Sequence, residues 1–116
     1  MKLNSRSPRN KFELRLYSAL RKQRASFKYE SEKILYTYSG HYTPDFVVET
    51  KQGKIYIEAK GYFRPEDKRK IAAVKKCNPT LDIRLVFYSV SKVNIRWAEK
   101  YGFPYAIGDI PQDWMK

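Results

Sequence analysis

The chain has 116 residues, a length typical of one domain, and 42% of them are hydrophobic, which argues against disorder. No apolar run approaches the roughly 20 residues of a membrane span, and no secretory signal is evident, so we expect a cytoplasmic protein without a membrane partner. Cys77 is the only cysteine, which excludes an internal disulfide and a cysteine metal site. The formal net charge of +12, together with ten tyrosines, favours nucleic acid as the partner.

The first third of the chain predicts an arm, a helix and a strand. Residues 1–10 are expected to form a flexible basic arm, and residues 11–24 a helix. Apolar residues repeat along this helix at positions i, i+4 and i+8: Phe12, Leu16 and Leu20. Asn10 and Glu13 have the spacing of a capping box at its start. The aromatic and β-branched stretch Phe27 to Tyr38 predicts a first strand, which Ser39 and Gly40 end.

The remaining two thirds predict a hairpin followed by alternating helices and strands. We expect a hairpin over about 42–60, helices over about 65–77 and 91–101, a strand over 81–89 and a short closing segment over 103–116. Ile71, Val74 and Cys77 are expected to face the core. The strand–helix–strand order from Ile55 to Tyr88 predicts two parallel strands. The chain is therefore expected to be one α/β domain over residues 1–116, with a mixed central β-sheet flanked by helices.

The hairpin carries an acidic pair and a lysine. A loop of even length centred between Lys51 and Gln52 pairs residues whose numbers sum to 103, so Asp45 lies opposite Glu58. Directly opposed Cβ atoms are about 5 Å apart on one face, and Lys60 shares that face. Two carboxylates this close repel each other unless a cation lies between them. Because a neighbouring lysine can position a water molecule, the arrangement predicts a divalent-metal site that hydrolyses a phosphodiester.

Two further groups of residues are candidates for the site. Glu13 could be a further metal ligand or only the capping carboxylate of its helix. Basic and small residues near the hairpin could contact a DNA backbone or could be ordinary surface and turn residues: His41, Gly61, Arg64, Lys68, Arg69 and Lys70.

Four segments stand in a fixed order: HYTPDF at 41–46, IEAKG at 57–61, DKRK at 67–70 and LDIRLVF at 81–87. Together they resemble the endonuclease I family of T-odd phages, which are Holliday-junction-resolving enzymes of the PD-(D/E)xK nuclease superfamily. The resemblance runs from about Glu13 to Trp114. It implies a PD-(D/E)xK (restriction-endonuclease-like) fold and a Mg²⁺-dependent DNA endonuclease that resolves four-way junctions by paired nicks. If the chain is phage-encoded, the cytoplasm is that of the infected host cell.

The resemblance also implies roles for single residues. Asp45 would bridge two Mg²⁺ ions, which Mn²⁺ can replace, and Glu58 and the carbonyl of Ala59 would ligate one of them. Lys60 would orient or activate the water, and Glu13 would serve the other ion. The family forms domain-swapped homodimers in which Glu13 and the hairpin come from different chains. The stretch from Lys28 to Tyr42, which would carry the exchange, is shorter here.

Two other functions fit the residues. The first is a monomeric nicking or mismatch endonuclease of the same superfamily, which differs in oligomeric state. The second belongs to another class, a basic DNA-binding protein without catalysis, which would show no Mg²⁺-dependent nicking.

Overall fold

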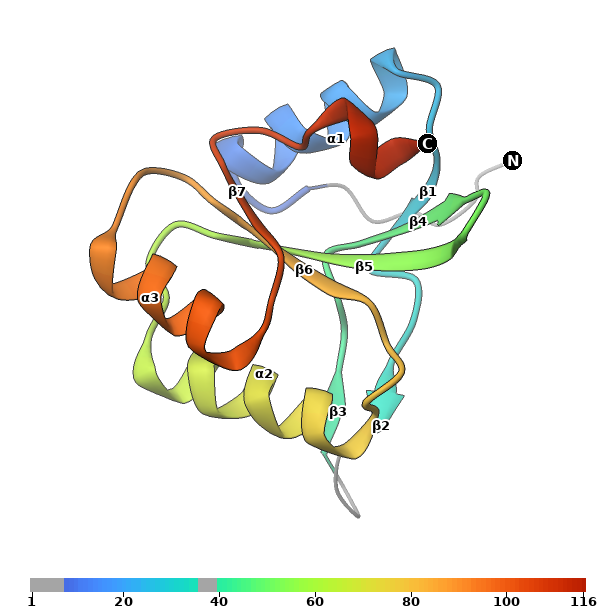
Figure 1. The fold of residues 1–116 in the computed structure, drawn as a ribbon. Coiled ribbons are helices and arrows are strands. Elements are labelled where there is room, and N and C mark those ends of the chain that lie inside the picture. Colours follow the sequence, from blue (N-terminus) through green and yellow to red (C-terminus); the bar gives the residue numbers. More distant parts are fainter. Residues whose placement is uncertain (1–7, 36–39) are drawn as a thin grey trace.

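A five-stranded mixed sheet with helices on both faces forms the centre of the molecule, as the sequence predicts (Figure 1). The computed structural model describes residues 8–35 and 40–116. The strand order is β1-β4-β5-β6-β7, and a separate two-stranded ribbon is formed by β2 and β3. This α/β arrangement is compatible with the nuclease-like fold that the motifs imply.

One half of the sheet is antiparallel. It contains β1 (Ser26–Tyr29), β4 (Phe46–Thr50) and β5 (Gly53–Lys60). The pairs Phe46–Ile57 and Thr50–Gly53 both sum to 103, so the predicted hairpin register is confirmed. Asp45 precedes the first paired residue of β4, and the same register places it opposite Glu58.

The other half is parallel. Its elements are α2 (Pro65–Cys77), β6 (Ile83–Phe87), α3 (Lys92–Tyr101) and β7 (Tyr105–Ile107). Strands β5 and β6 run parallel on either side of α2 in sequence, which confirms the predicted strand–helix–strand unit. The Ser91 side chain caps the start of α3, and Gly102 ends it in a left-handed conformation with φ of 77°.

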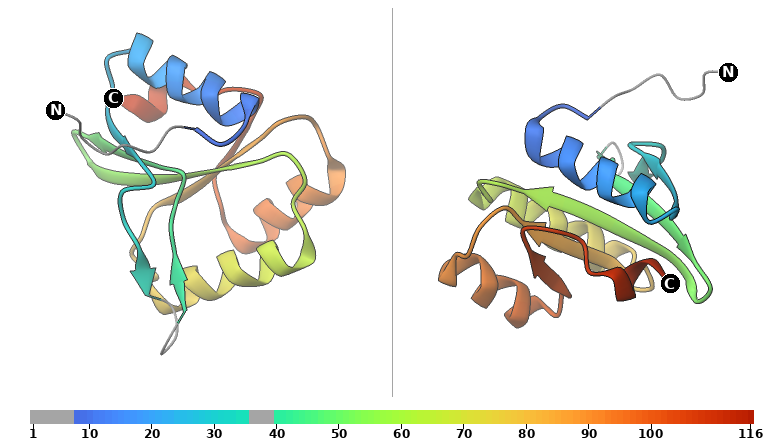
Figure 2. Two further views of the ribbon diagram at one scale, coloured as in Figure 1. Left: turned by 180° about the vertical axis from the view of Figure 1, so that it is seen from behind. Right: turned by 90° about the horizontal axis from the view of Figure 1, so that it is seen from above.

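Helices cover the two faces of the sheet in separate pairs (Figures 1 and 2). Helix α1 (Lys11–Lys22) and the 3₁₀ helix η1 (Gln112–Met115) lie on one face, and α2 and α3 lie on the other. Leu16 and Leu20 of α1 are fully buried on the first face, as their spacing predicts. In the ranges that the structure describes, no helix is long and apolar enough to cross a membrane.

Two expectations from the sequence were wrong. Phe27 to Tyr38 does not form one strand, because the described part of this stretch divides into β1 and β2 (Ile34–Leu35), and residues 36–38 lie outside the described residues. The break is at Glu30, whose φ of 47° is incompatible with an extended strand, and β2 instead pairs with β3 (His41–Tyr42). Cys77 is exposed at the end of α2 rather than buried, whereas Ile71 and Val74 are in the core.

Replacing Leu20 by Ala tests the packing of α1 on the sheet. Leu20 is 0% exposed, so Leu20→Ala should lower the free energy of unfolding by about 2–5 kcal/mol through lost burial and a cavity. Leu14→Ala in the same helix is the matched control, because Leu14 is 51% exposed and its loss should change stability by less than about 0.5 kcal/mol. Urea unfolding at equilibrium measures both variants. Equal losses would contradict the packed face.

Candidate active site

Three carboxylates are buried together at one end of the sheet. Glu13 comes from the first turn of α1, Asp45 directly precedes β4, and Glu58 lies in β5. They are 5%, 1% and 7% exposed. Buried carboxylates are rare unless they are paired or bind a metal, so this convergence marks the candidate site.

Asp45 is fixed by the neighbouring strand. Its Oδ2 accepts a hydrogen bond of 2.8 Å from the backbone N–H of Ala59, and its Oδ1 lies 3.3 Å from the guanidinium of Arg9. The backbone N–H of Glu30 donates to the carbonyl of Asp45 at 2.9 Å. Asp45 is thus held by β5 on one side and by the turn after β1 on the other.

The Glu13 carboxylate contacts the cap of α1 as well as the site, because its Oε2 accepts a 3.4 Å hydrogen bond from the Asn10 side-chain amide. The cap is the Asn10 side chain, whose Oδ1 accepts from the Glu13 N–H at 2.8 Å. The Glu13 carboxylate itself accepts a 2.5 Å hydrogen bond at Oε1 from the buried Tyr29 hydroxyl. Its position at the start of α1 brings it to Asp45 within the same chain.

Glu58 and Lys60 form the third part of the site. The Tyr42 hydroxyl donates to Glu58 Oε1 at 2.7 Å, and Lys60 Nζ lies 3.1 Å from Glu58 Oε2. Asp67 of α2 is 3.9 Å from the same ammonium group. Lys60 is therefore held beside Glu58, on the same face of the hairpin, as the sequence predicts.

Arg9 and Glu30 also belong to the site. Glu13, Glu30 and Asp45 each offer an oxygen, and these atoms lie within 4.8 Å of one another. The Arg9 guanidinium lies on all three, at 2.9 Å from Glu30, 3.3 Å from Asp45 and 3.8 Å from Glu13. Glu58 is outside this close group. Arg9 neutralises part of the negative charge.

Burial shifts the protonation of the acids. Desolvation, then the charges of Glu58 and Glu13, raise the pKa of Asp45 to about 8, and burial also raises the pKa of Glu58. Burial acts to lower the pKa of Lys60, but Glu58 and Asp67 outweigh it and raise that pKa. Burial and Glu58 raise the pKa of Tyr42 well above its usual value, so the hydroxyl keeps its proton and donates. These raised pKa values mean that the site favours binding of a proton or of another cation.

The residues present fit a small divalent cation. The donors are carboxylate oxygens, the ligands that Mg²⁺ and Mn²⁺ prefer, and oxygens around one Mg²⁺ lie at most about 4.2 Å apart. The oxygens of Glu13, Glu30 and Asp45 are already near that separation. The Arg9 guanidinium, itself a cation, already lies against these carboxylates. Both observations make Asp45 and Glu13 suitable ligands for one ion.

The predicted DNA-contacting residues divide into two groups. A hollow of about 260 Å³ beside the acids is lined by Arg9, Lys60, Lys70 and His41 among others. Gly61 directly follows β5 and is exposed, and a Cβ added there would meet no atom within 4 Å. Arg64, Lys68 and Arg69 are not among the residues that line the hollow. They lie on α2 or at its start.

Comparison with known proteins identifies the family. The family model described as phage endonuclease I matches residues 3–116. The chain belongs to this family. It is 34% identical to "Endonuclease I" of Escherichia phage T7 over 102 residues, which cover 78% of this chain and 66% of that protein. It is also 34% identical to "Endodeoxyribonuclease 1" of Enterobacteria phage T3 over 117 residues, covering 91% of this chain and 75% of that protein.

The chain thus spans a little less than two thirds of the phage T7 relative's length. Family membership supports a DNA-cleaving hydrolase. It agrees with the recognition made from the four sequence motifs.

Four residues of the candidate site were not predicted from the sequence: Arg9, Tyr29, Glu30 and Tyr42. Arg9 is predicted to lie in the arm, and because it precedes the Asn10 cap of α1, helical spacing gave no signal for its contact with Glu13. Tyr42 is inside the HYTPDF motif, in which only Asp45 is predicted to be a metal ligand. Nothing local pointed to Glu30, because its contact with Asp45 depends on a positive φ.

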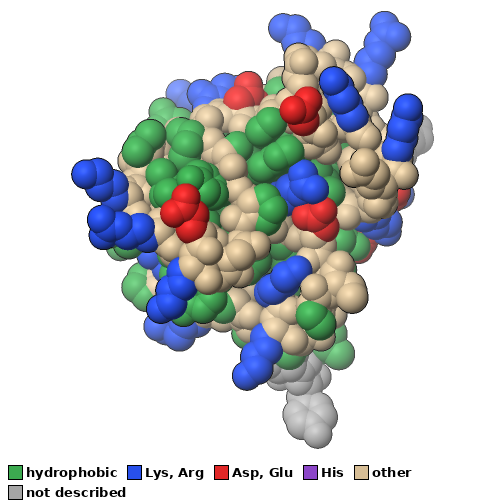
Figure 3. All heavy atoms as spheres, viewed as in Figure 1, with side chains coloured by type: hydrophobic (Ala, Val, Ile, Leu, Met, Phe, Trp, Pro, Cys, Tyr) green, Lys and Arg blue, Asp and Glu red, His purple; other side chains and the backbone are tan. Residues whose placement is uncertain are grey.

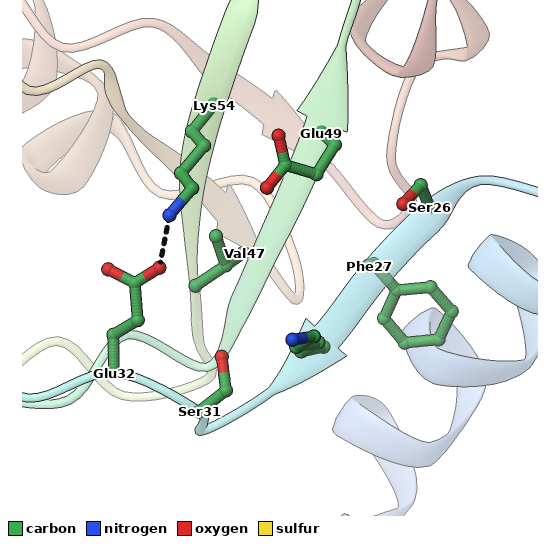
Figure 4. Close-up of a pocket in the computed structure, with 8 residues that line it drawn as sticks. Ser26, Phe27, Ser31, Glu32, Val47, Glu49 and Lys54 are labelled. Atoms are coloured by element: carbon green, nitrogen blue, oxygen red, sulfur yellow. Dashed lines mark hydrogen bonds and ion pairs between the residues drawn. The ribbon is translucent and has the colours of Figure 1, made fainter.

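A second hollow lies along β1, β4 and β5 (Figure 4). It measures about 150 Å³ and is lined by Val47, Glu49, Glu32 and Lys54 among others. Lys54 Nζ and Glu32 Oε2 are 2.8 Å apart, so their charges offset each other. This hollow therefore attracts a metal ion less than the acidic site does.

The raised pKa of Asp45 predicts a pH-dependent stability of the metal-free protein. The folded-state pKa of about 8 exceeds the unfolded value of about 3.9, so the folded state binds the proton more tightly. Stability from Asp45 is then present below about pH 4 and is lost as the pH rises toward 8. Asp45→Asn should remove this loss, so the melting temperature of the variant minus that of the wild type should increase from pH 5 to pH 8.

Thermal unfolding in EDTA measures that difference. Saturating Mg²⁺ should reduce it at pH 8, because the cation stabilises the ionised wild-type site. A difference that does not change with pH would show that Asp45 is ionised in the metal-free protein throughout this range.

Proposed function

We propose that the chain is a metal-dependent endodeoxyribonuclease that cuts branched DNA and resolves four-way junctions by paired nicks. The observation that carries this proposal is the convergence of buried Glu13, Asp45 and Glu58 with Lys60 at one end of the sheet. The family and the printed names of the two relatives support cleavage of DNA. The branched substrate is inferred from the resemblance of the four sequence motifs.

The residues divide the chemistry between them. Glu13 and Asp45 would hold one Mg²⁺ or Mn²⁺ ion, and Asp45, Glu58 and the Ala59 carbonyl would hold a second. Ions bound there supply Lewis acidity to the phosphodiester and lower the pKa of a water molecule. Lys60 would orient that water, because its ammonium is held 3.1 Å from Glu58 at the edge of the hollow.

The charge of the surface suits a DNA backbone. The net charge is +12 although the site itself is acidic, so cations outside the site dominate. Figure 3 shows Lys and Arg side chains projecting in several groups around one face of the molecule. Lys70 and His41 line the hollow next to Lys60, where a phosphate near the scissile bond would lie. We propose that Gly61, Arg64, Lys68 and Arg69 extend this contact along the DNA.

Lys60→Ala should separate catalysis from binding. Losing the group that orients the water should lower cleavage of a four-way junction in Mg²⁺ by roughly 10²–10⁴-fold, while junction binding in Ca²⁺ should change little. Lys54→Ala is the matched control, because Lys54 is also on β5 and also pairs with a glutamate, but outside the site. Single-turnover cleavage and gel-shift binding measure the two effects. Equal losses of binding and cleavage in folded Lys60→Ala protein would contradict the catalytic role.

Cleavage of a four-way junction beside a linear duplex of the same sequence tests the substrate and the metal together. We expect paired nicks in the junction with Mg²⁺ or Mn²⁺, little cutting of the duplex, and none in EDTA. Single nicks in both DNAs would favour the monomeric nicking or mismatch endonuclease. Binding without cleavage in any of these metals would favour a non-catalytic DNA-binding protein.

We also propose that the enzyme is a homodimer in which α1 and β1 are exchanged between chains. The structure has Glu13 beside Asp45 in one chain, and an exchange would form the same contacts between two chains. The connection that would open runs from β1 to β4 and includes residues 36–39, which lie outside the described part of the chain. The support for exchange is the resemblance of the motifs.

Mixing two inactive variants tests the exchange. In an exchanged heterodimer of Glu13→Ala and Asp45→Ala, one site takes intact Glu13 and intact Asp45 from different chains, while the other carries both lesions. Nicking of one junction strand should return and paired cleavage should not. The variants must be co-expressed with different tags, so that the purified heterodimer can be assayed against each inactive parent. No recovery in a verified heterodimer would place Glu13 and Asp45 of each site in the same chain.

A further inference from the structure

Each of the three buried acids has one oxygen held by an uncharged donor. Tyr29 donates its hydroxyl proton to Glu13 Oε1 at 2.5 Å, and Tyr42 donates to Glu58 Oε1 at 2.7 Å. The backbone N–H of Ala59 donates to Asp45 Oδ2 at 2.8 Å. The same kind of contact therefore occurs three times, from three different elements.

The other oxygen of each acid faces a cation. Asp45 Oδ1 and Glu13 Oε2 lie 3.3 and 3.8 Å from the Arg9 guanidinium, and Glu13 Oε2 also accepts a 3.4 Å hydrogen bond from the side-chain amide of Asn10. Glu58 Oε2 lies 3.1 Å from Lys60 Nζ. The two oxygens of every carboxylate thus have different partners, and the oxygens next to positive charge all belong to the acidic site.

We infer that Tyr29 and Tyr42 are positioning residues for metal binding. Each hydroxyl fixes one oxygen of a carboxylate, so that the second oxygen stays directed to the place where positive charge gathers. This inference rests on the proposed function, since it assigns a partner to two of the proposed metal ligands. Hydrogen bonds to ligating carboxylates orient them, and losing such a bond typically weakens metal affinity by 10–100-fold.

The two tyrosines are rigid enough for this role. Both are only 3% exposed, so neither ring can turn to solvent. The Tyr29 ring packs against Phe46 and Tyr17 at centroid distances of 5.4 and 6.2 Å. Tyr42 belongs to the core that β5, β6, α2 and α3 form. Because these rings are locked by packing, the hydroxyl positions are determined by the fold rather than by the carboxylates.

The experiment removes one hydroxyl at a time and measures metal binding without DNA. Tyr42→Phe and Tyr29→Phe keep the buried rings and remove only the donors. Tyr56→Phe is the matched control, because Tyr56 is buried in the same sheet and its hydroxyl donates to Glu32 at 3.2 Å, outside the site. Titration calorimetry and Mn²⁺ electron paramagnetic resonance give the dissociation constants and the number of ions bound.

We expect Tyr42→Phe and Tyr29→Phe each to raise the dissociation constant of one Mn²⁺ by about 10–100-fold, with Tyr56→Phe unchanged. The Mn²⁺ concentration for half-maximal junction cleavage should rise with it, and the cleavage rate should recover at high Mn²⁺. A purely structural role would lower stability in all three variants without this recovery. Unchanged or tighter Mn²⁺ binding in both site variants, against a wild type that binds, would overturn the inference.

Different results would disprove the proposed metal dependence and the positioning role of the tyrosines. If the wild type binds no Mn²⁺ at millimolar concentration, the proposed metal dependence fails. If the wild type binds Mn²⁺ and Tyr29→Phe and Tyr42→Phe bind it equally well, the positioning role fails while the metal dependence stands. Near-ultraviolet circular dichroism checks the fold of each variant, and the two site variants test the inference independently because their tyrosines come from different strands.

Discussion

The structure depends on the burial of three carboxyl groups at one end of the sheet. Glu13, Asp45 and Glu58 are each less than 10% exposed, and ionised carboxylates in such surroundings repel one another and lose hydration. Among the residues that the structure describes, every buried side-chain nitrogen and oxygen nevertheless has a hydrogen-bond partner. The donors and cations around the acids therefore decide whether this end of the domain can fold without a metal.

The partners of the three acids are of two kinds: donors that position the carboxylates and cations that neutralise their charge. Hydroxyl and backbone donors carry no net charge, but their hydrogen bonds favour the ionised carboxylates: those from Ala59 and Tyr42 act to lower the pKa of Asp45 and of Glu58. Arg9 and Lys60 supply charge but sit on flexible side chains, and that of Arg9 is 66% exposed. In the proposed metal-bound enzyme, divalent ions would replace the charge of these monovalent groups while the fixed donors stay in place. A site of this kind gives up some stability in the metal-free state for readiness to bind.

Local rules were sufficient for much of the fold and for the centre of the site. The hairpin register followed from turn symmetry, and that register placed Asp45 opposite Glu58. The parallel pairing of β5 and β6 followed from the intervening helix. The break at Glu30 and the docking of Arg9 did not follow, because both depend on contacts across at least 15 residues of sequence with Asp45. The exposure of Cys77 shows that periodicity fails at the last residue of a helix, where no further turn encloses it.

The site joins two parts of the chain that are separate in sequence. Glu13 reaches Asp45 because α1 packs its buried leucines on the sheet and β1 pairs with β4, so α1 and β1 form a packed unit that carries the acid. An exchange of that unit between two chains would keep the contacts of Glu13 with Tyr29, since both belong to it. Only the contacts to Asp45 and the rest of the sheet would pass between chains. The connection from β1 to β4 therefore decides between a closed monomer and an exchanged dimer, because the contacts within the site are the same in both.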